Sequence, residues 1–143
     1  MSKLSERLQE YMSERNLTQS ALAKLTGIER SNISEYLSQK HCPSYANLVT
    51  LLSFFDCSAD YLLGLKDIPT EQPFHPVGDF GKRLRMIMQE RTVSQYRMVL
   101  DLPVSSSVLY KWLHGISFPN ADNLIRIAEY LECSVDYLLG RTL

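Results

Sequence analysis

Apolar residues recur along this chain at the spacing of helices. One stripe near the start contains Leu4, Leu8, Tyr11 and Met12, and a later stripe contains Leu48, Leu51, Leu52 and Phe55. Residues three, four and seven positions apart share one face of a helix, so each stripe predicts an amphipathic helix that packs on a core. No stretch keeps the strict alternation of a half-buried strand. The pattern predicts an all-α fold whose first half has five short helices, over about 3–14, 18–25, 29–38, 44–55 and 58–63.

The second half of the chain repeats the first at a constant offset of 76 residues. Between residues 4–64 and 80–140, 18 of 61 aligned positions are identical without any gap, including the run Asp-Tyr-Leu-Leu-Gly at 60–64 and 136–140. Other positions keep their character, as Tyr36 and Trp112 do. A gapless match of this length indicates a duplicated unit, so a second set of five helices is expected 76 residues further on.

Polar residues and glycines at the expected helix ends support these boundaries. Residues whose side-chain oxygen can accept a hydrogen bond from the first turn are predicted as N-caps: Thr18, Ser58, Ser94 and Ser134. Ser44 and Asn120, each next to a proline, mark the start of the fourth helix in their copies. Gly64 and Gly140 follow the last helix of each copy and are expected to end it.

The segment between the two copies has the composition of a linker. Residues 65–79 contain Pro69, Pro73 and Pro76, which remove backbone donors and favour extended backbone. We therefore predict a first domain over 1–64, a semi-stiff linker over 65–79 that spans at most ~50 Å, and a second domain over 80–143. The linker is either a plain tether or a segment whose Phe74 and Val77 pack on one domain and set the relative angle of the two.

Composition narrows the class of protein. With 143 residues, 45% hydrophobic and 22% charged, the chain is expected to fold rather than to remain disordered. No apolar run approaches the ~18 residues of a membrane helix, and the polar start is unlike a signal peptide, so we expect a cytoplasmic protein with no membrane partner. Cys42, Cys57 and Cys133 lack C-x-x-C spacing, which favours buried thiols over a disulfide or a metal site.

The charge balance argues against strong non-specific binding of nucleic acid. Lysines and arginines number 15 and carboxylates 16, which gives a net charge of −1. The net charge is −1 over residues 1–64, −2 over 65–79 and +2 over 80–143. Because phosphate contacts need cations, this balance predicts modest affinity for non-specific DNA, although a local basic footprint remains compatible with it.

The join between the second and third expected helices, residues 19–37, has the features of two helices that meet at a tight turn. Ala23 is small where the two helices touch, and Gly27 permits the positive φ of the turn. Ile28, Ile33 and Tyr36 point toward the core and leave the opposite side of the later helix outward. This segment resembles the helix-turn-helix of the lambda-repressor-like family, also called the Cro and XRE type.

The resemblance covers about 120 of the 143 residues, because residues 112–119, 123–128 and 134–140 are also similar to the family's C-terminal half. It implies two tandem five-helix DNA-binding domains, each with a recognition helix for a major groove ~12 Å wide. The second copy departs from the pattern, since Val99 and Pro103 replace Ala23 and Gly27. Proline cannot adopt a positive φ, so this turn must differ, and the angle between its two helices stays open.

The resemblance implies phosphate contacts at the start of the second helix of the first copy. Thr18 and Gln19 lie there, where free backbone amides would meet a phosphate. Ordinary helix capping is the alternative role of these two residues. Lys40 and Tyr45 are further candidates for contacts with the DNA backbone.

The resemblance also implies base contacts from the third helix of the first copy. The residues that would face base edges are Arg30, Ser31, Ser34 and Glu35. Arg30 suits guanine O6 and N7, Glu35 suits cytosine N4, and Asn32 would reach the backbone or a base. The alternative is a solvated helix face on which Glu29, Arg30 and Glu35 pair with one another.

The second copy presents a different set of residues at the same places. Its candidates for DNA contact are Ser94, Gln95, Ser106, Ser107, Tyr110 and Lys111. Tyr110 and Lys111 suit a thymine methyl group and a phosphate or guanine, and Lys82, Arg83 and Arg85 supply the positive balance of this copy. Two copies on one chain would present reading helices to successive major grooves ~34 Å apart, on an asymmetric site.

These features predict a sequence-specific transcriptional regulator that binds a double-stranded DNA operator. A bacterial or phage repressor is expected, acting as a single chain or as a homodimer. The alternative is a protein-interaction or dimerisation module of the same fold in which one or both copies no longer bind DNA. An enzyme is not expected, because His41, His75 and His114 are scattered and no catalytic, metal or cofactor motif is present.

Overall fold

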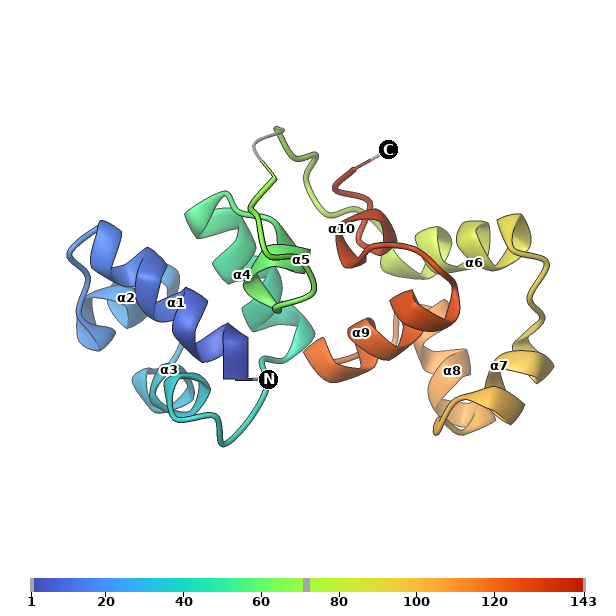
Figure 1. Cartoon of the computed structure of the whole chain (residues 1–143). Coiled ribbons are helices and arrows are strands. Elements are labelled where there is room, and N and C mark those ends of the chain that lie inside the picture. Colours follow the sequence, from blue (N-terminus) through green and yellow to red (C-terminus); the bar gives the residue numbers. More distant parts are fainter. Residues whose placement is uncertain (1, 71–72, 143) are drawn as a thin grey trace. The chain divides into compact units, whose positions relative to one another are not determined.

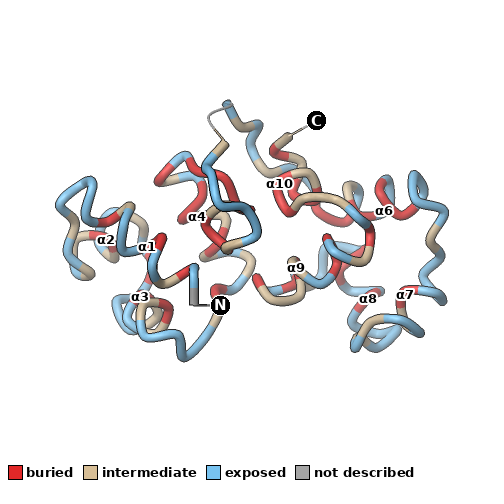
Figure 2. The backbone as a smooth tube through the Cα atoms, viewed as in Figure 1, coloured by how far each residue is buried: buried red, intermediate tan, exposed pale blue. Residues whose placement is uncertain are grey.

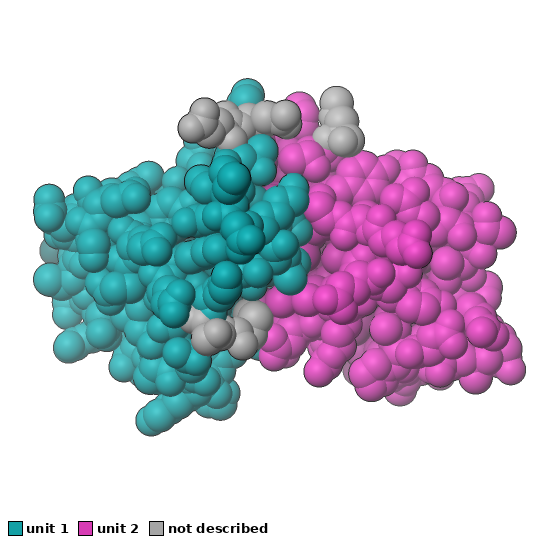
Figure 3. All heavy atoms as spheres, in the orientation of Figure 1, with its two compact units in different colours: residues 1–73 teal, residues 74–143 magenta. Residues whose placement is uncertain are grey.

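The computed structural model describes residues 2–70 and 73–142. The chain divides into two compact helical units, unit 1 over residues 1–73 and unit 2 over residues 74–143 (Figure 3). Unit 1 contains α1 (Ser2–Glu14), α2 (Gln19–Thr26), α3 (Arg30–Leu37), α4 (Tyr45–Phe55) and α5 (Ala59–Leu62). Unit 2 contains α6 (Phe80–Glu90), α7 (Gln95–Asp101), α8 (Ser106–Leu113), α9 (Ala121–Tyr130) and α10 (Val135–Leu138) (Figure 1). None of the described helices is long and apolar enough to cross a membrane.

The helices confirm the all-α prediction and the duplication. Each of the ten described helices begins and ends within one residue of the predicted range, and the described residues contain no strand. The agreement is close because helix ends depend on local chemistry. Thr18, Ser58, Ser94 and Ser134 each accept a backbone hydrogen bond in the first turn, as predicted. Gly64 and Gly140 follow α5 and α10 with φ of 81° and 76°, the left-handed conformation expected of them.

The apolar stripes form the two cores. Leu4, Leu8 and Met12 of α1 and Leu48 and Leu51 of α4 are buried in the core of unit 1. Unit 2 buries the equivalent positions of α6 and α9, including Phe80, Leu84, Leu124 and Ile127. Figure 2 shows buried positions recurring along the helices of each unit. Burial of this kind is the main favourable contribution to folding of such small units.

An arginine joins the first helix of each unit to the end of the last. In unit 1 the Arg7 guanidinium donates to the carbonyl oxygens of Tyr61 and Lys66 and lies 4.0 Å from the centroid of the Tyr61 ring. In unit 2, Arg83 donates to the carbonyl oxygens of Tyr137 and Thr142 and lies 4.3 Å from the Tyr137 ring. Each arginine thereby links the first helix of its unit to the last helix and to the segment that follows it.

The two ends of the predicted linker are attached to different units. On the unit 1 side, the backbone amides of Leu65 and Lys66 donate to the carbonyl oxygen of Asp60. On the unit 2 side, the backbone amide of His75 donates to the carbonyl oxygen of Arg141, and the Arg141 guanidinium lies 4.3 Å from the centroid of the Phe74 ring. Phe74 therefore packs on unit 2, as the second alternative expects of this residue, whereas the role of the linker in setting the relative angle of the domains stays a prediction.

Candidate nucleic-acid interface

The turn between α2 and α3 depends on Gly27. Its φ is 78°, and its amide donates to the carbonyl oxygen of Ala23 at 2.9 Å, which ends α2. The Thr26 hydroxyl donates to the carbonyl oxygen of Leu22 and accepts from the amide of Ile28. The predicted positive φ of Gly27 is confirmed, and the chain turns directly into α3.

Replacing Gly27 with alanine is expected to destabilise unit 1 by about 1 kcal/mol, because a Cβ atom strains the left-handed backbone. The cost is conformational, since a Cβ built at Gly27 meets no atom within 4 Å. The measurement is urea denaturation followed by circular dichroism. Gly78→Ala is the matched control, because Gly78 also has open space around it but lacks a positive φ. Equal effects of the two substitutions would contradict the role assigned to Gly27.

One side of α3 is fixed in the core of unit 1. Ile28, Ile33 and Tyr36 are at most 4% exposed, which confirms the predicted inward row. The Tyr36 hydroxyl accepts a hydrogen bond from Nδ2 of Asn47 on α4 at 2.8 Å, and burial raises the pKa of the Tyr36 hydroxyl. These contacts prevent rotation of α3 about its axis, so the outward side chains have a defined direction.

The outward side of α3 carries three of the predicted base-contact residues. Arg30, Ser31 and Ser34 are exposed, and their spacing places them on adjoining parts of one helix surface. Asn32 and Glu35 are only partly exposed. Glu35 lies beside the loop after α3, with Oε2 3.6 Å from Nε2 of His41. The structure therefore brings Arg30, Ser31 and Ser34 together and gives Glu35 a neighbour that sequence reasoning did not indicate.

The remaining candidates of unit 1 border α3. The Thr18 hydroxyl accepts from the amide of Ala21 at 3.1 Å, so the capping alternative describes its observed bond. Gln19 is half-buried at the start of α2. Lys40 is exposed in the loop after α3, where its amide donates to the carbonyl oxygen of Glu35. Tyr45 is half-buried at the start of α4.

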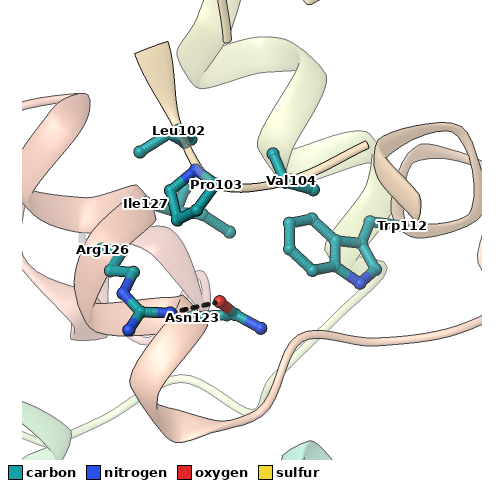
Figure 4. Close-up of a pocket in the computed structure, with 7 residues that line it drawn as sticks. All are labelled: Leu102, Pro103, Val104, Trp112, Asn123, Arg126 and Ile127. Atoms are coloured by element: carbon teal, nitrogen blue, oxygen red, sulfur yellow. Dashed lines mark hydrogen bonds between the residues drawn. The ribbon is translucent and has the colours of Figure 1, made fainter. Parts of the chain in front are cut away.

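Unit 2 makes the corresponding turn without a left-handed residue, as Pro103 predicts. Leu102 ends α7 in extended conformation, with φ of −108° and ψ of 151°. The amide of Val104 then donates to the carbonyl oxygen of Leu102 at 2.7 Å, a tight turn centred on Pro103. Figure 4 shows a small hollow beside this turn, lined by Leu102, Pro103, Val104, Trp112, Asn123, Arg126 and Ile127.

Side chains of unit 2 hold the altered end of α7 in place. Asp101 Oδ2 accepts from the Tyr130 hydroxyl of α9 at 2.6 Å and from Arg97 Nε at 3.1 Å. The hydrogen bond to Asp101 raises the pKa of Tyr130. A carboxylate at a helix C-terminus is electrostatically unfavourable, and these two donors offset that cost. Unit 1 has Leu25 and Phe54 at the positions of Asp101 and Tyr130.

The predicted contact residues of unit 2 are exposed on or near α8. α8 buries Leu109, Trp112 and Leu113 in the core. The exposed candidates are Ser94, Gln95, Ser106, Ser107, Tyr110 and Lys111. Ser94 caps α7, with its hydroxyl accepting from the amide of Arg97 at 3.1 Å. The outward side chains of the helix-turn-helix in unit 2 therefore differ from those of unit 1, and the aromatic ring of Tyr110 takes the place of Ser34.

The basic cluster at the start of unit 2 is used largely within the unit. Lys82 is exposed, whereas Arg83 is bound to α10 and Arg85 donates to the carbonyl oxygen of Leu113 at 3.3 Å. Arg85 also contacts His114, whose ring stacks on Tyr110. Sequence reasoning missed this connection, although the four-residue spacing of Tyr110 and His114 is a signal for contact on one helix face.

Comparison with known proteins agrees with this geometry. Residues 5–68 match a helix-turn-helix domain family, and residues 83–142 match the Cro/C1-type HTH DNA-binding domain family. The uncharacterized HTH-type transcriptional regulator YobD of Bacillus subtilis (strain 168) is 36% identical over 64 residues, which are 45% of this chain and 57% of that protein. No solved structure shows significant similarity to the chain. The chain belongs to the helix-turn-helix family and carries two Cro/XRE-type domains in tandem.

Proposed function

We propose that the chain is a sequence-specific regulator of transcription that binds double-stranded DNA through α3 and α8, each in a major groove. The observation that carries this proposal is the fixed orientation of α3. Its inward row is buried and bonded to α4, and its outward row exposes Arg30, Ser31 and Ser34. A rigid helix with short polar side chains and one arginine outward suits the floor of a major groove.

The proposed contacts divide into base and backbone contacts. In unit 1, Arg30 reads guanine and Glu35 accepts from cytosine, while Asn32 reaches a base or the backbone. Backbone phosphates are bound at the start of α2 by Thr18 and Gln19, with Lys40 and Tyr45 as further contacts. The equivalent residues of unit 2 are Ser94, Gln95, Ser106, Ser107, Tyr110 and Lys111. Because the two outward rows differ, the operator is expected to be asymmetric.

We propose that the protein acts in the cytoplasm as a repressor, and that its operator lies on bacterial or phage DNA. Two reading helices joined in one chain would occupy two successive grooves of an operator. A protein that occupies such a site excludes others from the same stretch of duplex. In this proposal the predicted linker, residues 65–79, is the connection that allows both domains to bind one operator.

Replacing Arg30 with alanine is expected to weaken binding by about 5- to 150-fold, the value of a bidentate arginine–guanine contact. The thermal stability of unit 1 should stay nearly unchanged, because Arg30 is exposed. Fluorescence anisotropy with a duplex selected from a random pool measures the affinity. Lys66→Ala is the control, since it removes the same charge from an exposed residue outside the helices. Equal losses in both variants would mean that Arg30 contributes only general charge.

A second candidate function for unit 2 is self-association with another copy of the chain. Tyr96, Leu100 and Ile116 of unit 2 are 74%, 56% and 63% exposed. The equivalent positions of unit 1 are Ser20, Lys24 and Lys40. Large apolar side chains that replace polar ones on a surface are typical of interaction sites. This asymmetry favours a dimerisation role for the second copy, either beside DNA binding or in its place.

Substituting lysine for Leu100 and Ile116, as in unit 1, is expected to convert a dimer into a monomer. Two buried charges per protomer oppose association, and the lost apolar contacts add to the effect. Sedimentation velocity over a range of protein concentrations measures the oligomeric state. Leu25→Lys is the control, because Leu25 is a similarly exposed leucine of unit 1, 61% accessible. A wild-type chain that remains monomeric at high concentration removes this candidate.

A further inference from the structure

The outward face of α8 carries an aromatic ring that neighbouring groups hold in place. The rings of Tyr110 and His114 stack with centroids 3.8 Å apart and planes inclined by 21°. His114 Nδ1 lies 2.8 Å from the carbonyl oxygen of Tyr110. The Arg85 guanidinium of α6 lies 3.3 Å from His114 Nε2 and donates to the carbonyl oxygen of Leu113 at the same distance. A chain of contacts therefore runs from α6 to the exposed ring on α8.

The two polar contacts of His114 fit one tautomer of its ring. An arginine guanidinium only donates, so a hydrogen bond between Arg85 and Nε2 of His114 requires Nε2 to be the acceptor. In that tautomer the ring proton lies on Nδ1, from which it can be donated to the carbonyl oxygen of Tyr110. Both ring nitrogens have a partner, and the imidazole plane is fixed against the phenol ring. Tyr110, which is 52% exposed, has one face covered by this ring and the remainder accessible.

Unit 1 lacks all three members of this chain. The positions of Arg85, Tyr110 and His114 are occupied there by Gln9, Ser34 and Ser38. Gln9 bonds within α1, to the Ser13 hydroxyl, and Ser38 bonds to the carbonyl oxygen of Glu35. The stack is therefore a feature of unit 2 and not a requirement of the fold that the two units share.

We propose that Tyr110 is the specificity-determining residue of unit 2 and that it recognises thymine through the 5-methyl group, with Arg85 and His114 as positioning residues. Two apolar side chains of α8 are exposed, Tyr110 at 52% and Val108 at 38%, and of the two only Tyr110 is held by a stacked ring. Ser106 and Ser107 have little carbon surface. Apolar contact is the means by which a side chain recognises the thymine methyl group in the major groove. A ring already held in one rotamer loses little conformational entropy on binding. This inference rests on the proposed DNA-binding function.

The test begins with a duplex selected by the wild-type chain from a random pool, in which each thymine is replaced in turn by uracil. Removal of the one contacted methyl group is expected to weaken binding about fourfold, the value of one buried carbon group. Tyr110→Phe should keep this difference between thymine and uracil, since the ring surface remains. Tyr110→Ser, which copies Ser34 of unit 1, should abolish it.

The positioning role of Arg85 and His114 is tested by replacing each with the residue that unit 1 has at the equivalent position, Gln9 or Ser38. Arg85→Gln and His114→Ser should each weaken binding about threefold while Tyr110 is present, because the ring must then be ordered on binding. Neither substitution should have an effect in the Tyr110→Ser background. The thermal stability of each variant is measured in parallel, and nitrogen NMR of His114 in the wild-type chain should show the Nδ1–H form.

Each contrary outcome has a distinct meaning. A pool without any enriched sequence overturns the proposed function and this inference with it. An enriched site at which no uracil substitution matters overturns the thymine contact alone. If Tyr110→Phe greatly weakens binding while thymine and uracil duplexes bind equally well, the Tyr110 hydroxyl contacts a phosphate, and the proposed thymine contact is again overturned. Equal effects of His114→Ser with and without Tyr110, or a Nε2–H tautomer, overturn the positioning role.

Discussion

Replacing Arg141 with alanine is expected to destabilise unit 2 by about 3–5 kcal/mol, the usual cost of breaking a buried ion pair from one side. Arg141 Nη1 lies 2.7 Å from Asp136 Oδ1, and the two side chains are 5% and 4% exposed. The guanidinium also lies against the Phe74 ring. Removal of the arginine leaves the Asp136 carboxylate buried without this cation and takes away the surface on which Phe74 packs.

Urea denaturation followed by the fluorescence of Trp112 measures this effect, because the chain has one tryptophan and it is buried in unit 2. Arg126→Ala is the control, since Arg126 is an exposed arginine of the same unit. The double variant Arg141→Leu with Asp136→Asn should lose less than the sum of the single losses, because no uncompensated charge remains. A loss below about 1 kcal/mol for Arg141→Ala, the range of exposed pairs, would show that the ion pair contributes little.

The substitution Gly81→Ala is expected to destabilise unit 2 by about 2–3 kcal/mol, at the upper end of overpacking effects. A Cβ built at Gly81 lies 2.5 Å from the carbonyl oxygen and 3.0 Å from the carbonyl carbon of Leu113. These are backbone atoms at the end of α8, so α6 and α8 must separate to admit the methyl group. Because α8 carries the proposed reading residues, the affinity for a selected duplex should fall together with the stability.

Unit 1 provides the matched control for Gly81. The equivalent residue is Ser5, whose hydroxyl donates to the carbonyl oxygen of Leu37 at 2.6 Å. Ser5→Ala removes one hydrogen bond without a clash and should cost only about 1 kcal/mol. Trp112 fluorescence reports the stability of unit 2, and circular dichroism reports both units. An alanine at 81 that leaves the urea midpoint unchanged would contradict the close approach of α6 and α8.

Local chemistry explains why the helices and the inward row of α3 were predictable. A helix end depends on a capping side chain and the next three amides, as at Thr18, where one hydroxyl accepts from Ala21. The turn at Gly27 likewise depends on the φ that one residue can adopt. Ile33 and Tyr36 are buried because their spacing matches the helical period. None of these features requires knowledge of which distant segments meet.

The contacts of long side chains were not predictable in the same way. The sequence indicated that Arg83 and Arg85 belong to a basic cluster. In the structure, Arg83 is bound to α10 and Arg85 contacts His114. Glu35 was predicted to contact a base, and the structure adds a neighbour that the sequence did not indicate, because Oε2 of Glu35 lies 3.6 Å from Nε2 of His41. A flexible charged side chain has many rotamers of similar energy, and the choice among them depends on the carbonyls and rings that the fold places nearby.

For this chain, periodicity and the 76-residue repeat were enough to specify two all-α units, their helix boundaries and the face of α3 that is buried. Only the tertiary structure showed three other contacts: the pairing of Arg141 with Asp136 and Phe74, the contact of Gly81 with α8, and the stack of His114 on Tyr110. The first group depends on interactions within a few residues of chain, which identical spacing reproduces in both copies. In the second group, the contacts of Gly81 with α8 and of Arg141 with Phe74 join segments that are distant in sequence and come together only when the core has packed. Asp136 and Arg141 are five residues apart and Tyr110 and His114 are four apart, so these two contacts depend on the side-chain rotamers that the folded surroundings select.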